Sequence, residues 1–258
     1  FHLVKFCGSV KKALEMAPEL SRRGGRKKPI VIASKATAER EYEALTKFGA
    51  KLVMYGEETY PRLLQYVADA PPVLTIRGHT HLFNHAKLFG LVGARNASAN
   101  GCNFARKVAT DVGKAGYTIV SGLARGIDAA AHRGSITTGT VAVIAGGIDH
   151  IYPPEHAGLF DEIAACGAII SENPFGMEPH ARSFPGRNRI IAGMSRGILV
   201  VEASLKSGSL ITADYAHDYG RDVFAVPGSP MDPRCHGTNR LLRDGATMVE
   251  SAQDILNN

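Results

Sequence analysis

The residues best able to do chemistry in this sequence are arginines that stand beside glycines, serines and an aromatic ring. They are densest between Phe184 and Thr212, where Phe-Pro-Gly-Arg-Asn-Arg is followed by an apolar run and then by Ser-Gly-Ser-Leu-Ile-Thr. Guanidinium groups grip phosphate oxygens, an aromatic face stacks on a nucleobase, and the first amides of a helix attract anions. This stretch therefore predicts an anion-binding assembly with a stacking partner.

The residues alone leave two interpretations of this stretch open. In the first, Arg187 and Arg189 follow a Pro-Gly turn and grip phosphates, Phe184 offers a face to a base, and the amides after Ser207 remain free at the start of a helix. In the second, the arginines lie on a solvated helix face and the glycines only make turns, because short matches of this kind are common by chance.

The elements that must position these residues follow from a regular alternation of strand-like and helix-like segments after residue 88. This spacing predicts a doubly wound, mostly parallel α/β sheet with right-handed crossovers. The predicted strands are 88–92, 117–120, 140–144, 168–170, 198–201, 222–225 and 247–249. The predicted helices are 99–115, 127–138, 155–166, 188–194, 210–219 and 238–242.

Ligands of such sheets bind outside the carboxyl ends of the strands, so the loops that follow strands are the places to search. Four predicted strands, those ending at Val92, Val120, Ile170 and Val201, lead into glycines, serines or arginines. We expect these loops to converge on one crevice, which is a more specific indication than any single loop.

The first 50 residues do not show this alternation of strands and helices. They contain predicted helices at 10–16 and 36–48 and a basic run at 21–29 between them. We expect an N-terminal helical segment over residues 1–50 and a larger domain over 51–258. The basic run is either an exposed linker or a nucleic-acid contact, because runs of charge are usually solvated. Its cationic residues are Arg22, Arg23, Arg26, Lys27 and Lys28.

Several other types of site are disfavoured. The turn at Gly90–Gly93 lacks the full dinucleotide-binding spacing, and no Walker A lysine is present. His79, His81 and His85 lack acidic or cysteine partners nearby, so no metal site is expected. Asp128 and His132 stand four residues apart on a predicted helix without a nucleophile elbow, which favours packing or capping over catalysis.

The composition fits a nucleic-acid partner and a reducing compartment. The formal net charge is +6 with an isoelectric point near 9.2, and the four cysteines are scattered. No apolar run approaches the roughly 20 residues that cross a bilayer. We therefore expect a cytoplasmic protein without membrane contact, and the first residue, Phe1, indicates a piece of a longer protein.

At this point the motifs resemble those of the DNA-processing protein A (DprA/Smf) family. Among them are Val-Gly-Ala-Arg, Ser-Gly-Leu-Ala-Arg-Gly-Ile-Asp, Phe-Pro-Gly-Arg-Asn-Arg and Ser-Gly-Ser-Leu-Ile-Thr, and the likeness covers about residues 60–246. The resemblance implies an extended Rossmann-like domain that binds single-stranded DNA as a homodimer, without catalysis or a cofactor. It also implies loading of the RecA recombinase in natural transformation, and a partial SAM-like or helix-hairpin-helix-like domain over residues 1–50.

The resemblance also assigns roles to residues of this chain. It implies cationic contacts by Arg95, Arg125, Arg187 and Arg189, a backbone-amide cradle at Gly122, Gly186 and Ser209, and base or sugar contacts by Phe184 and Asn188. Ala94 stands where the family often has Ser, which removes one potential hydrogen bond to phosphate and leaves Arg95 as the stronger candidate. Thr75 stands where an aromatic residue is common.

One alternative is an enzyme similar to the lysine-decarboxylase-like phosphoribohydrolases, which also bind phosphate at a helix start. Those enzymes have a Pro-Gly-Gly-x-Gly-Thr turn and a nearby catalytic Glu. Here the corresponding turn is Ser207-Gly-Ser-Leu-Ile-Thr, and Glu202 stands alone. The alternative predicts that the protein releases the base from nucleoside monophosphates.

Overall fold

The structure, a computed structural model, describes residues 2–84 and 87–258, and the chain divides into two compact units. The first unit ends at Lys47, and the second runs from Phe48 to Asn258. The described part of the first unit is helical. Its elements are α1 (His2–Cys7), α2 (Val10–Arg23) and α3 (Lys35–Lys47).

Helix α2 continues beyond its predicted end at Met16 to Arg23, so the start of the basic run is helical and not a loop. Arg22 and Arg23 pair with Glu19 at 3.4 and 3.0 Å, one turn earlier on the helix. Pairs at this spacing support a helix. The other basic residues of the run, at 26–28, are exposed between α2 and α3.

The second unit is built on one sheet of nine strands in the described residues. Their order across the sheet is β1-β2-β6-β5-β4-β3-β7-β8-β9. The strands are β1 (Ala50–Met54), β2 (Val73–Gly78), β3 (Lys87–Val92), β4 (Tyr117–Ser121), β5 (Thr140–Val143), β6 (Ala168–Ser171), β7 (Gly197–Val200), β8 (Asp222–Ala225) and β9 (Thr247–Met248).

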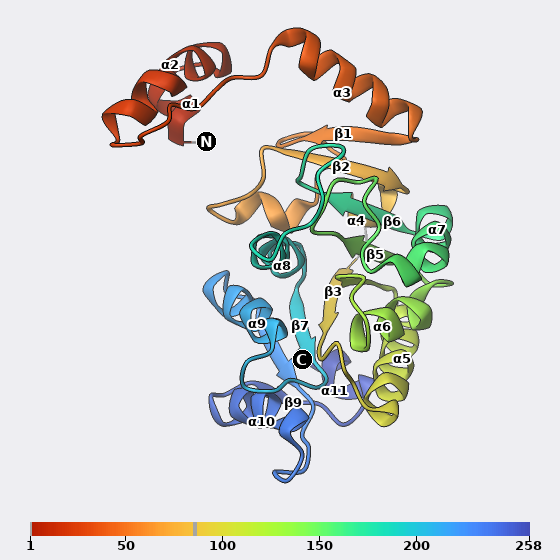
Figure 1. Cartoon of the computed structure of the whole chain (residues 1–258). Coiled ribbons are helices and arrows are strands. Elements are labelled where there is room, and N and C mark those ends of the chain that lie inside the picture. Colours follow the sequence, from red (N-terminus) through yellow and green to blue (C-terminus); the bar gives the residue numbers. More distant parts are fainter. Residues whose placement is uncertain (1, 85–86) are drawn as a thin grey trace. The chain divides into compact units, whose positions relative to one another are not determined.

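Each central strand buries side chains on both faces, as its continuous apolar sequence predicts. In β7, Ile198 and Val200 belong to the core that packs under α8 and α9, whereas Leu199 faces the core under α5 and α6. Successive residues of a strand point to opposite faces. Figure 1 shows these two helix pairs on opposite sides of the sheet.

The helices of the second unit follow the expected alternation with the strands. The α-helices are α4 (His81–Asn84), α5 (Ala99–Lys114), α6 (Ile127–Ser135), α7 (Ala157–Cys166), α8 (Ser183–Met194), α9 (Gly208–Asp218), α10 (His236–Arg243) and α11 (Ala252–Leu256). The short 3₁₀ helices are η1 (Arg62–Tyr66), η2 (Pro154–His156) and η3 (Pro233–Cys235).

The predicted doubly wound, mostly parallel sheet is confirmed, with one antiparallel end. Strands β3 to β9 pair in parallel, but β2 pairs antiparallel with both β1 and β6. Residues Ala50 and Arg77 lie opposite each other in the β1–β2 pair.

Helix α8 begins at Ser183, five positions before its predicted start at Asn188. The predicted Pro-Gly turn is therefore wrong: Pro185 lies in the first helical turn, where a missing N–H leaves no hydrogen bond unmade. The consequence concerns Arg187 and Arg189. They are two positions apart on a helix, which rotates their side chains by about 200° around the helix axis, so the two point to nearly opposite sides of α8.

Candidate functional site

A pocket of about 450 Å³ opens at the carboxyl ends of β3 and β7. From β3 the chain continues through β4, β5 and β6 toward one end of the sheet, whereas β8 and β9 follow β7 toward the other. Ligands of open α/β sheets bind at such a switch point. We call it the large pocket; its walls include Arg95, Asp128, Phe184, Arg187, Asn188, Ser209 and Arg234.

A smaller pocket of about 70 Å³ adjoins the large one and shares part of its wall. We call it the small pocket; its residues are Arg95, Gly122, Ala124, Arg125, Tyr152, Pro153, Phe184 and Arg187. Arg95 and Phe184 line both pockets. We call the two pockets with their shared wall of arginines and an aromatic ring the hollow.

The loop after β4, residues 122–126, is held rigidly by side chains from α6 and η2. Leu123 has a φ of +56°, which is unusual for a residue with a side chain. Its N–H donates to His132 Nε2 at 3.3 Å, and its carbonyl accepts from His156 Nδ1 at 2.9 Å. This loop is therefore a preformed wall of the small pocket.

Asp128 and His132 support this loop, as expected for packing or capping residues. The Asp128 carboxylate accepts from the amides of Gly122 and Ala124 at 3.1 and 3.4 Å. His132 Nδ1 donates to Thr140 Oγ1 at 2.7 Å, so its Nε2 is the acceptor. Burial lowers the pKa of His132 to about 3, so the ring is neutral, whereas burial raises the pKa of Asp128.

Arg187 is buried and spans the carboxyl ends of β4 and β5. Its Nη1 donates to the carbonyl of Gly122 and, at 2.5 Å, to that of Val143, and its Nε donates to Asn188 Oδ1 at 3.0 Å. Burial lowers its pKa to about 10, and the nearby Arg95 acts in the same direction. Arg187 therefore positions the wall of the pocket and carries positive charge beneath it, with its hydrogen bonds directed to the protein.

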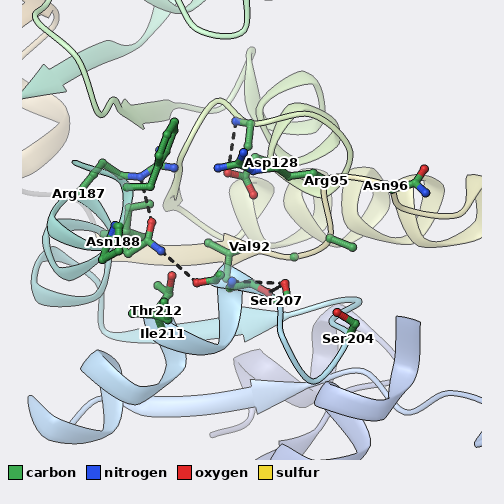
Figure 2. Close-up of a pocket in the computed structure, with 18 of the residues that line it drawn as sticks. Val92, Arg95, Asn96, Asp128, Arg187, Asn188, Ser204, Ser207, Ile211 and Thr212 are labelled. Atoms are coloured by element: carbon green, nitrogen blue, oxygen red, sulfur yellow. Dashed lines mark hydrogen bonds between the residues drawn. The ribbon is translucent and has the colours of Figure 1, made fainter. Parts of the chain in front are cut away.

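Asn188 and Ser209 connect α8 with the start of α9. Asn188 Nδ2 donates to the carbonyl of Gly208 at 3.1 Å, a contact drawn in Figure 2. Helix α9 begins at Gly208, two residues earlier than predicted, and Ser207 caps it by accepting from the Ser209 amide at 3.4 Å. The first turn of α9 thus lines the large pocket, where the helix dipole favours an anion.

Arg95 enters the hollow from the loop after β3, on the side opposite α8 (Figure 2). Its side chain is exposed, and its guanidinium lies over the ring of Phe184, 4.7 Å from the centroid. The prediction that Phe184 offers a face to a base is therefore modified, because Arg95 covers one face of this ring. Phe184 in turn contacts the ring of Tyr152 at 5.6 Å between centroids.

Arg125 lies at the small pocket and forms an ion pair with Glu155. The hydrogen bond between them raises the pKa of Arg125 and lowers the pKa of Glu155. Both side chains are more than 40% exposed. Arg125 is thus a solvent-accessible cation in an exposed ion pair.

Arg189 and Gly186 lie outside the hollow, since neither belongs to the described residues that line the two pockets. Arg189 pairs with Glu172, and its Nη1 donates to the Asp69 carbonyl at 2.7 Å. Gly186 is a helical residue, and a Cβ built on it would meet the Glu172 carboxylate at 3.6 Å. These contacts do not bring them together with the other candidates, because α8 points Arg189 away from Arg187.

Among the residues of the hollow that the predicted site did not contain are Tyr152, Asp128 and Arg234. Arg234 lies in η3, after the carboxyl end of β8, and pairs with Asp232 at 2.8 Å. Its place after the strand that ends at Ala225 is the sequence signal for it, since the loops that follow strands carry the ligand contacts of such sheets.

Glu202, the candidate acid of the enzymatic alternative, is engaged elsewhere. Its carboxylate accepts from the amide and hydroxyl of Ser98 at 2.9 and 2.5 Å. Gly101, in the first turn of α5, packs so close that a Cβ there would lie 2.6 Å from the carboxylate. Glu202 is therefore a buried anchor for the start of α5.

The described residues contain no group of three or more His, Cys, Asp or Glu side chains placed to hold a metal ion. His85, one of the three clustered histidines, lies outside the described residues. In the same described part of the chain, no helix is both long and apolar enough to cross a membrane.

Comparison with known families gives two matches along the chain. The family described as DNA recombination-mediator protein A matches residues 51–258. The family described as DprA-like N-terminal HHH domain matches residues 1–44. The two matches together cover nearly the whole sequence.

Individual proteins agree with these matches. The chain is 46% identical over 202 residues to Protein Smf of Synechocystis, a stretch that is 76% of this chain and 51% of that protein, so it spans about half the length of this relative. The crystal structure of DNA processing protein A from Streptococcus pneumoniae matches with a TM-score of 0.81 and 38% identity, over 88% of this chain and 78% of that one.

A structure from Helicobacter pylori, which describes how DNA processing protein A of that organism binds single-stranded DNA, matches with a TM-score of 0.74 and 28% identity. The match covers 81% of this chain and 94% of that chain. The predicted fold and the predicted family resemblance are both confirmed by these comparisons.

Proposed function

From the premise that this chain belongs to the DNA recombination-mediator protein A family, we propose that it binds single-stranded DNA in the large pocket and acts as a non-catalytic recombination mediator. The observation that carries this proposal is the position of Arg95. An exposed guanidinium backed by the ring of Phe184 faces the amino end of α9 across the switch point of the sheet.

The roles within the large pocket follow from exposure and hydrogen bonding. Arg95 and Arg234 contact phosphates, since both reach the pocket from surface loops. The first turn of α9 adds the positive end of the helix dipole and the hydroxyls of Ser207 and Ser209, since the Ser209 amide already donates to Ser207 Oγ. Arg187 and Asn188 hold these elements together by hydrogen bonds. The positive charge of Arg187, buried below the pocket, also favours an anion in it.

Such a site binds any sequence, because phosphates are the same along a strand and every base has a face that can stack. The relative from Helicobacter pylori is described as binding single-stranded DNA, which supports this assignment. The basic net charge of +6 favours the same partner.

We further propose that the protein loads the RecA recombinase onto incoming single strands during natural transformation and recombination, and that it works as a cytoplasmic homodimer. The family membership supports these proposals. The segments around α9 and α10 are the candidate dimer surface; sedimentation that shows only monomer at micromolar concentrations would contradict the dimer. Residues 1–50 are proposed to be part of a helix-hairpin-helix domain, in line with the family match to residues 1–44.

The test is a salt titration of binding to single-stranded and double-stranded oligonucleotides by fluorescence anisotropy, with Arg95→Ala beside the wild type. We expect tighter binding to single strands, and a log-log salt slope that is shallower by about 0.7 for each phosphate that the variant no longer neutralises. Arg196→Ala is the matched control, because Arg196 is exposed just before β7, at the opposite edge of the sheet. Equal affinity of the Arg95→Ala variant and the wild type would contradict the proposal.

A further inference from the structure

The small pocket has the features of a second nucleotide subsite, in addition to the contacts proposed for the large pocket. One wall is aromatic, formed by Tyr152 and Phe184, and Arg125 brings a cation to the same hollow. The loop that carries Arg125 is fixed by the hydrogen bonds of Leu123 to two histidines. The subsite is therefore built before any ligand arrives.

Within the aromatic wall, Tyr152 is the ring that a base can reach. Arg95 lies over the ring of Phe184 at 4.7 Å, whereas Tyr152 is 46% exposed and contacts Phe184 at 5.6 Å. A base on Tyr152 would lie next to the pair formed by the Arg95 guanidinium and the Phe184 ring, since the Tyr152 and Phe184 rings meet at an angle of 58°. Phe184 then supports its two neighbours and does not itself receive the base.

The cation of the small pocket, Arg125, is already paired with a carboxylate of the protein, that of Glu155. Arg125 Nε is bonded to Glu155 Oε1, and both groups are accessible to solvent. A phosphate that approaches Arg125 must compete with this carboxylate, because both are anions that accept from the same guanidinium. Glu155 therefore stands in the place that a phosphate oxygen would take.

We propose that the small pocket is a second nucleotide subsite, in which a base stacks on Tyr152 and its phosphate displaces Glu155 from Arg125. This rests on the proposed function and deepens it, since a strand in the large pocket continues into the small one along their shared wall. Glu155 therefore lowers the affinity of the small pocket for a nucleotide, because the phosphate must displace it from Arg125.

The first test uses the absence of tryptophan from this chain. Tyr152→Trp supplies a single tryptophan, whose emission can be excited apart from that of the tyrosines, and we expect oligothymidylate to quench this emission through stacking. Tyr66→Trp is the matched control, because Tyr66 is 72% exposed and lies outside both pockets. Unchanged emission from the Tyr152→Trp variant at saturating oligonucleotide would overturn the base position.

The second test measures affinity. Tyr152→Ala is expected to weaken binding about tenfold, and Tyr152→Phe is expected to retain it because the ring remains. Because Tyr152 is exposed, we expect both variants to fold as the wild type does, and circular dichroism checks this. Equal affinities for Tyr152→Ala, Tyr152→Phe and the wild type would overturn the stacking role.

The third test is a double-mutant cycle between Glu155 and Arg125. Glu155→Gln is expected to tighten binding roughly two- to fivefold, and the gain should vanish in the Arg125→Ala background. Glu162→Gln, an exposed change on α7, controls for the general loss of negative charge. A gain that persists without Arg125, or one equal to that of Glu162→Gln, would overturn the exchange.

The failure of this inference differs from the failure of the proposed function. If the wild type binds and Arg95→Ala weakens binding while the Tyr152 and Glu155 variants behave as wild type, only the second subsite is wrong. If the wild type does not bind single strands at all, the proposed function itself is wrong.

Discussion

The guanidinium group of Arg187 occupies the space that a side chain at position 122 would need. A Cβ built on Gly122 overlaps Nη1 and Cζ of Arg187, which in turn donates to the Gly122 carbonyl. These two residues are 65 positions apart in the sequence. Their contact joins the loop after β4 to α8 and thereby shapes the wall shared by the two pockets.

The first prediction concerns this contact. Gly122→Ala should lower the free energy of unfolding by about 1–3 kcal/mol, because the methyl group must displace a buried guanidinium. Urea unfolding measures the change. Gly158→Ala is the control, since a Cβ at position 158 in α7 meets nothing within 4 Å. If the two variants were equally stable, the packing of Arg187 on Gly122 would be wrong.

A second prediction separates Arg187 from Arg95. Arg187→Ala should lower the free energy of unfolding by about 3 kcal/mol, because two carbonyls and Asn188 lose a buried donor. Arg187→Lys should not restore it, since an ammonium group cannot replace the planar fork. Arg95→Ala should leave stability unchanged and weaken binding.

Urea unfolding and oligonucleotide binding, measured on the same samples, distinguish these roles. An Arg187→Ala protein as stable as the wild type, with only the salt slope of DNA binding reduced, would instead make Arg187 a direct phosphate contact, as the sequence suggested.

The third prediction concerns Arg189, which holds Glu172 and Asp69 outside the hollow. Arg189→Ala should destabilise the protein by about 1–3 kcal/mol, because Glu172, whose pKa is raised by burial, loses its partner. At temperatures where the variant is folded, its affinity for single-stranded DNA should remain within about twofold of the wild type. A large loss of affinity with normal thermal stability would place Arg189 in the binding site.

The fourth prediction concerns the neutral imidazole of His132. Its pKa falls from 6.5 to about 3 on folding because the ring is buried, so the unfolded chain binds a proton that the folded chain does not. Stability contributed by this group is complete above pH 6.5 and is lost as the pH falls toward 3. Acid should therefore destabilise the wild type through His132.

His132→Gln tests this, because glutamine keeps a donor and an acceptor but does not titrate in this range. Urea unfolding from neutral pH to about pH 4 should show a flatter profile for the variant than for the wild type. Asp128 and Glu172, whose pKa values are raised, act with the opposite sign in both proteins and cancel in the difference. Parallel profiles would contradict the assignment.

Much of this architecture followed from the sequence by itself. The alternation of apolar runs with helical segments determined the parallel strands, because a strand buried on both faces must be apolar throughout. The predicted strand at Asp222–Ala225 has the observed bounds. Small residues and arginines after the strands predicted a crevice at one edge of the sheet, because carboxyl ends of parallel strands share one edge, and the large pocket lies there. These are local properties, carried by neighbouring residues.

Only the tertiary structure decided which arginines share the hollow. The way α8 packs on the sheet sends Arg187 inward and Arg189 toward Glu172, and the sequence does not specify that orientation. The other contacts of the hollow also join segments that are distant in the chain. Arg95 lies over Phe184, Arg125 pairs with Glu155, and Arg234 reaches the large pocket from η3. A sequence pattern specifies residue types and spacing, but the partner of a charged side chain is chosen by the packing of elements that meet only in the folded state.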